Sequence, residues 1–245
     1  MIPKIIHFCW LSNDPYPEKI RRCIDSWHKY LPDYEFVHWN LQKLNEIDSV
    51  WAKQAFEHKK YAFAADFIRC YSVYNFGGIY LDTDVELFGS FDSFLNLKAF
   101  MGLDSRGDLE AAVFGAEKHA EWLGKALEFY QSRNFVNTDG TFNIITMPNV
   151  FKSVFNQLLG REYPQYEEIS DLSFLMLFPR DFFSPKDYTT GVIRRTSRTV
   201  AVHHFEAGWL KKSGWGWRKH QAKIILAKLI GHRLSNYLSK ISHSK

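Results

Sequence analysis

The sequence predicts an α/β fold with a mostly parallel central sheet, on three observations. Short apolar segments at residues 4–10 and 35–39 enclose residues 17–30, whose apolar side chains recur at helical spacing. A strand, a helix and a strand in this order are typical of a βαβ unit. Residues 58–76, without Gly or Pro, precede a third apolar segment at 79–81, so we expect a second helix and a third strand.

The remaining elements follow from turn residues and apolar runs. Gly77 and Gly78 end the helix at 58–76, because glycine accepts the backbone angles of a helix end. Helices are expected on both faces of the sheet, since parallel sheets are covered on both sides. The later chain predicts short strands at 98–104, 111–115 and 199–203, a helix at 117–132 and a turn at 139–141.

The 245 residues fit one large domain, 1–210, followed by a basic tail, 211–245. The net charge of +4 is too small to indicate a nucleic-acid partner, but no acidic residue follows Glu206. Residues 218–241 combine lysine and arginine with leucine and isoleucine near helical spacing. We interpret them as an amphipathic helix lying on an anionic membrane surface, with a solvated helix packed on the domain as the alternative.

Cysteine content and hydropathy predict the cell compartment. The three cysteines form no CxxC pair, which favours a reducing compartment and argues against a thiolate metal site. The apolar stretch at the N-terminus is too short for a signal peptide, and no run is long enough to span a membrane. We therefore expect a cytoplasmic protein, held by its tail at the inner face of the cell membrane.

Two aspartates, Asp82 and Asp84, follow the third predicted strand. Ligands bind at the carboxyl ends of strands in open α/β sheets, and side chains two residues apart on a strand point to the same face. Two converging carboxylates repel each other unless a cation or a proton lies between them. Oxygen ligands of this kind suit Mg²⁺ or Mn²⁺.

Three interpretations of this aspartate pair remain open on these grounds. The pair can be two surface aspartates in a turn. It can belong to a haloacid-dehalogenase-type phosphatase with Asp82 as nucleophile, although such a pair normally follows the first strand of a domain. It can also hold a metal that grips the diphosphate of a nucleotide sugar.

Three segments together resemble glycosyltransferase family 32: IPKIIHFCWLS at 2–12, AFAADFIRCYSVYNFGGIYLDTDVELF at 62–88 and AVHHFEAGW at 201–209. This family includes yeast initiating mannosyltransferases and bacterial capsule and lipopolysaccharide enzymes. The central segment also resembles the glucosyltransferase domains of large clostridial toxins. The resemblance implies a GT-A fold, retention of anomeric configuration and a Mn²⁺ or Mg²⁺ cofactor.

The resemblance also implies which residues bind the donor. Trp10 would stack on the nucleotide base, although a core position is the alternative. Asp66 and Arg69 would contact the hexose and phosphate as catalytic residues, rather than form an ordinary ion pair on a helix. Tyr80 would lie near the sugar or serve packing, and Asn143 would line the cleft.

The metal site is assigned in the same way. Asp84 would bind the metal directly, and Asp82, also catalytic, would bind it through water or contact the ribose and the sugar. His204 is the first choice for a further metal ligand and His203 the second, with a satisfied surface pair as the alternative. Trp209 would donate its indole N–H to the diphosphate.

The sequence thus predicts transfer of a hexose from a nucleoside-diphosphate sugar, with a UDP-sugar favoured. The acceptor would be a glycan or a lipid-linked oligosaccharide in polysaccharide biosynthesis, such as that of capsule or lipopolysaccharide. A toxin-like enzyme that glycosylates proteins and the phosphatase remain the alternatives.

Overall fold

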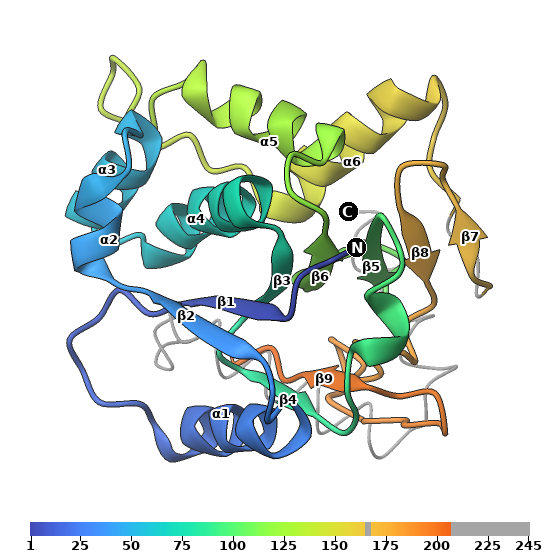
Figure 1. The fold of residues 1–245 in the computed structure, drawn as a ribbon. Coiled ribbons are helices and arrows are strands. Elements are labelled where there is room, and N and C mark those ends of the chain that lie inside the picture. The colour runs from blue at the N-terminus through green and yellow to red at the C-terminus, as the bar shows by residue number, and fades with distance from the viewer. Residues whose placement is uncertain (165–167, 207–245) are drawn as a thin grey trace.

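A computed structural model describes residues 1–164 and 168–206 (Figure 1). Its centre is a seven-stranded sheet with the strand order β2-β1-β3-β6-β5-β8-β7, beside a two-stranded sheet of β4 and β9. The predicted helix at 218–241, the tail that contains it and Trp209 lie outside the described residues. Within residues 1–164 and 168–206, no helix is both long and apolar enough to cross a membrane.

The first three elements form the predicted βαβ unit. β1 (Ile5–Cys9), α1 (Glu18–Tyr30) and β2 (Glu35–Trp39) follow one another, and β1 and β2 pair in parallel. On α1, the fully buried Trp27 donates its indole N–H to the Val85 carbonyl at 2.7 Å. The helix is thereby fastened to the chain that follows the two aspartates.

The connection from α4 (Tyr61–Phe76) to β3 (Gly78–Leu81) depends on glycine. Gly77 and Gly78 have φ angles of 67° and 105°, which side chains with a Cβ rarely adopt. A Cβ on Gly78 would also lie 2.6 Å from the Ile5 carbonyl oxygen. These two residues let the chain leave α4 and enter β3 directly against β1, with which β3 pairs in parallel.

The rest of the sheet is mixed in direction. β6 runs antiparallel between β3 and β5, β8 is parallel to β5, and β7 is antiparallel to β8. Five strands therefore run one way, and β6 and β7 run the other. The predicted mostly parallel sheet is confirmed, with two added strands, β8 and β7, that the sequence did not predict. The bounds are β5 Ala99–Leu103, β6 Leu109–Ala116, β7 Ser170–Asp171 and β8 Met176–Phe178.

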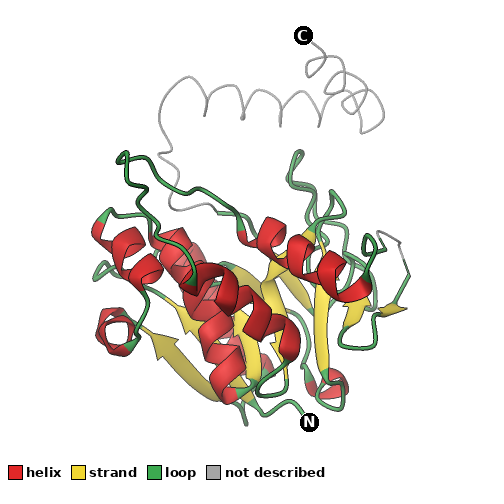
Figure 2. Ribbon diagram, turned by 90° about the horizontal axis from the view of Figure 1, so that it is seen from above, coloured by secondary structure: helices red, strands yellow, loops and turns green. Residues whose placement is uncertain are grey.

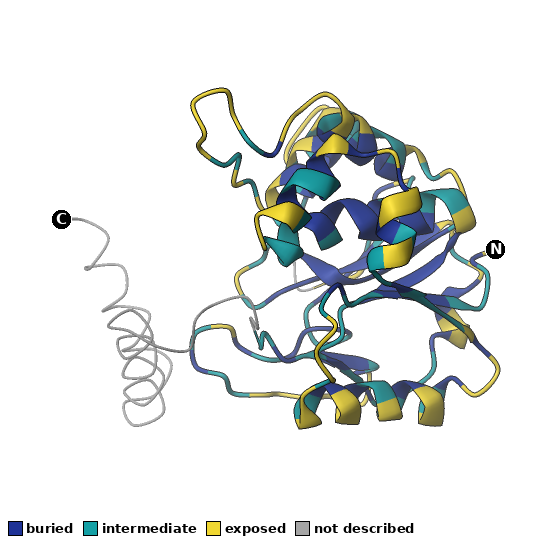
Figure 3. Ribbon diagram, turned by 90° about the vertical axis from the view of Figure 1, so that its left-hand side faces the viewer, coloured by how far each residue is buried: buried dark blue, intermediate teal, exposed yellow. Residues whose placement is uncertain are grey.

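Both faces of the large sheet are covered (Figures 1 and 2). One face carries α4, α5 and α6, with α2 and α3 beside them, and the other carries α1 and the β4–β9 sheet (Figure 1). Figure 3 shows the strands buried between these layers and the outer side of α1 exposed. The remaining bounds are α2 Leu41–Glu46, α3 Val50–Glu57, β4 Val85–Leu87, η1 Asp92–Phe94, α5 Glu121–Gln131, α6 Met147–Leu159 and β9 Ala201–His203.

Candidate active site

The two aspartates lie in a tight turn at the carboxyl end of β3. β3 ends at Leu81, β4 begins at Val85, and the Val85 N–H donates to the Asp82 carbonyl at 3.0 Å. The sequence had indicated that both aspartates lie on one strand, but they lie between two strands. The turn, and not the alternation of a strand, directs both carboxylates to the same place.

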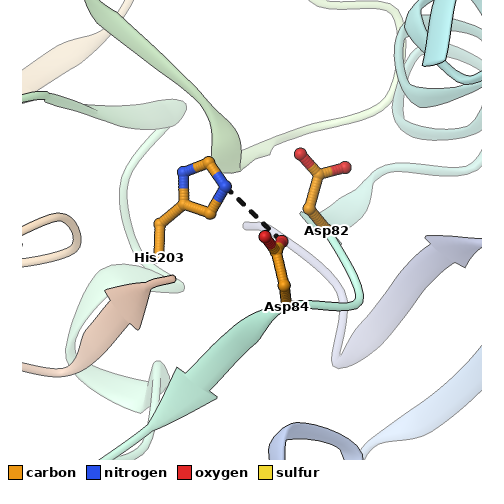
Figure 4. Close-up of side chains that lie close together, drawn as sticks. All are labelled: Asp82, Asp84 and His203. Carbon is orange, nitrogen blue, oxygen red and sulfur yellow. Dashed lines mark ion pairs between the residues drawn. The ribbon is translucent and has the colours of Figure 1, made fainter. Parts of the chain in front are cut away.

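A histidine from the far end of the described chain joins this turn. β9 pairs with β4 so that His203 lies opposite Val85, and His203 Nε2 lies 3.4 Å from Asp84 Oδ1 (Figure 4). Asp82, Asp84 and His203 each offer a ligand atom, and these atoms lie within 4.8 Å of one another. Carboxylate oxygens with one imidazole nitrogen suit a divalent ion such as Mn²⁺.

The structure places His203, the second choice from the sequence, beside the two aspartates, and not His204, the first choice. Successive side chains of extended chain point to opposite faces, so His204, directly after β9, turns away from the carboxylates. Its Nε2 instead forms a hydrogen bond with Glu86 Oε2 at 2.8 Å, while its backbone N–H donates to the Asp84 carbonyl at 3.0 Å. The His204 backbone thus binds the turn, while its side chain faces away from the cluster.

The charges of this cluster are strongly coupled. Burial acts to raise the pKa of Asp84, but His203 and a 2.8 Å hydrogen bond from the Glu206 N–H hold it below its usual range. Burial lowers the pKa of His203, yet Glu110 and Asp84 together raise it well above its ordinary value. The carboxylates thus create a site that attracts positive charge, whether a proton or a metal ion.

Arg69 of α4 contacts both an aspartate of its own helix and an aspartate of the turn. Its guanidinium lies 3.1 Å from Asp66 Oδ1 and 3.3 Å from both Asp82 oxygens, and it donates to the Ala111 carbonyl at 2.7 Å. The cation also stacks over the Tyr80 ring, 4.9 Å from its centre. The Arg69 and Asp66 side chains are only 8% and 11% exposed, so they form a buried network and not a solvated pair on a helix surface.

Burial raises the pKa of both carboxylates beside Arg69. It raises the pKa of Asp66 to about 6, against the opposing effect of Arg69. It also raises the pKa of Asp82, with the neighbouring Asp84 adding to the effect and Arg69 opposing it. The hydroxyl of Tyr80 donates to Asp82 Oδ1 at 3.0 Å, which fixes the orientation of this carboxylate.

Trp10 and Asn143, the other described residues predicted to bind the donor, lie in loops after β1 and before α6. Trp10 follows β1, is half-buried, donates its indole N–H to the Asp14 carbonyl at 3.0 Å and packs edge-on against Tyr16. Asn143 lies between α5 and α6, where its backbone N–H donates to the Phe135 carbonyl at 2.8 Å. The predicted roles of both residues in donor binding remain predictions.

Sequence reasoning missed Glu110. This residue lies in β6, is 4% exposed, and its Oε1 lies 3.1 Å from His203 Nδ1. A recognisable feature was present, because Glu110 borders the apolar run AAVF, and a carboxylate in a buried strand needs a partner. The predicted strand began at residue 111, so Glu110 was left outside it.

The part of the chain that contains the two aspartates is similar to known glycosyltransferases. Residues 17–101 match the family described as glycosyltransferase sugar-binding region containing DXD motif. Inositol phosphoceramide mannosyltransferase 3 of Schizosaccharomyces pombe is 35% identical over 130 residues, which are 50% of this chain and 35% of that protein. Mannosyl phosphorylinositol ceramide synthase SUR1 of Saccharomyces cerevisiae is 30% identical over 135 residues, 52% of this chain and 34% of that protein.

Among solved structures, the glycosyltransferase PaToxG has the same fold, with a TM-score of 0.52 and 22% identity. The similarity covers 65% of this chain and 70% of that one. The fold is thus the GT-A fold, and the resemblance drawn from the sequence is confirmed. Residues 17–101, which include both aspartates, are thus similar to the glycosyltransferase sugar-binding region that contains a DXD motif. It spans about a third of the length of the two yeast relatives.

Proposed function

We propose that the protein is a metal-dependent, retaining glycosyltransferase that moves a hexose from a nucleoside-diphosphate sugar to an acceptor hydroxyl. One observation carries this proposal: the cluster of Asp82, Asp84 and His203 adjoins the Arg69 network at the carboxyl end of β3. A phosphatase with Asp82 as nucleophile fits less well, because Tyr80 and Arg69 both bind that carboxylate.

Each part of the site has a task in this reaction. Asp84 and His203 would bind the metal directly, and Asp82 would bind it while remaining oriented by Tyr80. When bound, a divalent cation neutralises the negative charge that develops on the leaving diphosphate. Arg69 presents a fixed positive charge beside the same position, which is the arrangement that stabilises a developing anion.

Retention is proposed to follow a same-face route. Among the described carboxylates of the site, Asp66 is paired with Arg69 and Glu110 with His203, so neither is a free nucleophile. The acceptor oxygen would bond to the anomeric carbon as the carbon–oxygen bond to the diphosphate breaks, and a phosphate oxygen would take the acceptor proton. An inverted product in an NMR time course would contradict this route.

The donor and the acceptor are proposed from different observations. The sequence favours a UDP-sugar, while the names of the two yeast relatives specify mannosyl transfer. Those names also specify a lipid that carries inositol phosphate, which supports a lipid-linked acceptor, or a glycan in polysaccharide biosynthesis such as that of capsule or lipopolysaccharide. We place the enzyme on the cytoplasmic side, with its basic tail on an anionic membrane surface.

A thermal-shift panel tests the donor and the metal together. UDP-hexoses and guanosine diphosphate mannose are added one at a time, each with Mn²⁺, Mg²⁺ or EDTA. We expect one nucleotide sugar to raise the melting temperature with the metal and not with EDTA, because a ligand that binds only the folded state stabilises it. A metal-independent shift, or no shift with any donor, would contradict the proposal.

A further inference from the structure

The buried carboxylate of Glu110 is held on two sides. Glu110 Oε1 accepts from the Ala112 N–H of its own strand at 3.0 Å. The same oxygen lies 3.1 Å from His203 Nδ1, on a strand of the other sheet. The side chain therefore has a fixed position, and it is 4% exposed.

His203 contacts this carboxylate through Nδ1, and its other ring nitrogen, Nε2, faces the aspartates. When Nδ1–H donates to Glu110, Nε2 is the nitrogen left for a ligand on the side of Asp84, which lies 3.4 Å away. A histidine that binds a metal usually donates its other N–H to a carboxylate or carbonyl, and this bond fixes the ring orientation.

We propose that Glu110 is a positioning residue of the metal site, which fixes the His203 ring so that Nε2 faces a divalent cation held with Asp82 and Asp84. This inference rests on the proposed function, because it requires that the cluster binds a metal. Glu110 itself lies outside the group of ligand atoms, so its effect on the metal passes through His203.

A purely structural role for Glu110 is the competing explanation, because a buried carboxylate and a buried histidine each need a partner. The neighbouring pair provides a matched control. His204 follows His203 in the chain and binds Glu86 at 2.8 Å, on the side of β9 that faces away from the cluster. Both pairs join a glutamate to one of two consecutive histidines. They differ in whether the histidine faces the aspartates, and also in burial, because the Glu86 side chain is 35% exposed and the Glu110 side chain 4%.

The test is a Mn²⁺ titration followed by the electron paramagnetic resonance signal of free Mn²⁺, without any sugar donor. We expect Glu110→Gln to weaken Mn²⁺ binding by about 10- to 100-fold. Glu86→Gln should stay within about twofold of the wild type, because Glu86 contacts His204 and not His203. Equal affinities for Glu110→Gln and the wild type would overturn the inference, as would equal losses in both variants. A wild-type protein that binds no Mn²⁺ would instead refute the metal-dependent function.

A second measurement needs no variant at position 110, in case Glu110→Gln does not fold. Histidine ¹⁵N spectra of the wild type are recorded with and without Zn²⁺ as a diamagnetic substitute, and His203→Asn assigns the resonance. We expect the Nδ1 of His203 to keep its proton while Nε2 shifts on metal addition. The opposite assignment of the two nitrogens would overturn the inference.

Discussion

At the scale of the residue, a few charged side chains in buried pairs determine the geometry of the site. Arg69 faces Asp66 and Asp82, and His203 faces Asp84 and Glu110. Each positive group therefore lies between two carboxylates from different parts of the chain. Pairs buried in this way are fixed in geometry, and removing one partner leaves an uncompensated charge.

Asp84→Asn is the most direct test of the metal assignment. The amide removes the negative charge that would face the proposed cation, so we expect metal-dependent donor binding to disappear and turnover to fall at least about 100-fold. Calorimetric titration of the donor with Mn²⁺, together with product formation, measures both effects. The matched control is Asp25→Asn, at an exposed position of α1. Wild-type turnover in Asp84→Asn would show that the metal lies elsewhere.

At the scale of the element, strand alternation and the turn after β3 determine which side chains meet. Consecutive side chains at the end of β9 point to opposite sides, so His203 faces Asp84 and His204 faces Glu86. In β1, the buried His7 bonds across strands: its Nε2 donates to the Gly77 carbonyl and its Nδ1 accepts from the Trp39 indole. This histidine ties β1 to β2 and to the end of α4.

His7 makes the fold sensitive to acid. Burial lowers its pKa to about 4 from the ordinary 6.5. The unfolded chain therefore binds a proton at higher pH than the folded one, so stability is full above pH 6.5 and is lost as the pH falls toward 4. Over this interval we expect the free energy of unfolding to fall by about 3 kcal/mol through His7.

The variant His7→Gln isolates this contribution. Glutamine can donate and accept in the same place but does not titrate, so urea unfolding between pH 7 and 4 should show a smaller loss of stability than in the wild type. His58→Gln, at an exposed histidine, is the control and should follow the wild type. The same acid dependence in His7→Gln and the wild type would show that His7 is not responsible.

At the scale of the whole molecule, sheet topology gathers the site. β3 lies between β1 and β6, and β6 runs in the opposite direction, so the start of β6 lies beside the end of β3. Trp10 after β1, Asp82 after β3 and Glu110 at the start of β6 thereby reach the same edge of the sheet. The small sheet then brings His203 across to the turn, so that the chain between β4 and β9, about 110 residues, forms a closed loop.

The proposed membrane contact also belongs to this scale. Removal of residues 211–245 is expected to release the protein from anionic liposomes, because each lysine or arginine near such a surface contributes about 1 kcal/mol. Co-sedimentation of the full chain and the shortened chain measures the difference, with neutral liposomes and an unchanged melting temperature as controls. Equal binding of both chains to anionic liposomes would place the contact on residues 1–210.

The sequence alone determined the α/β class, the first βαβ unit, the helix before the glycine pair and the two aspartates at a strand end. These are local properties, because periodicity, turn residues and motif spacing act over a few residues. Tertiary structure decided that His203 rather than His204 faces Asp84, that Glu110 holds His203, and that the sheet is mixed. Those outcomes depend on the register and direction of strands far apart in the chain, where a shift of one residue turns every side chain to the other face.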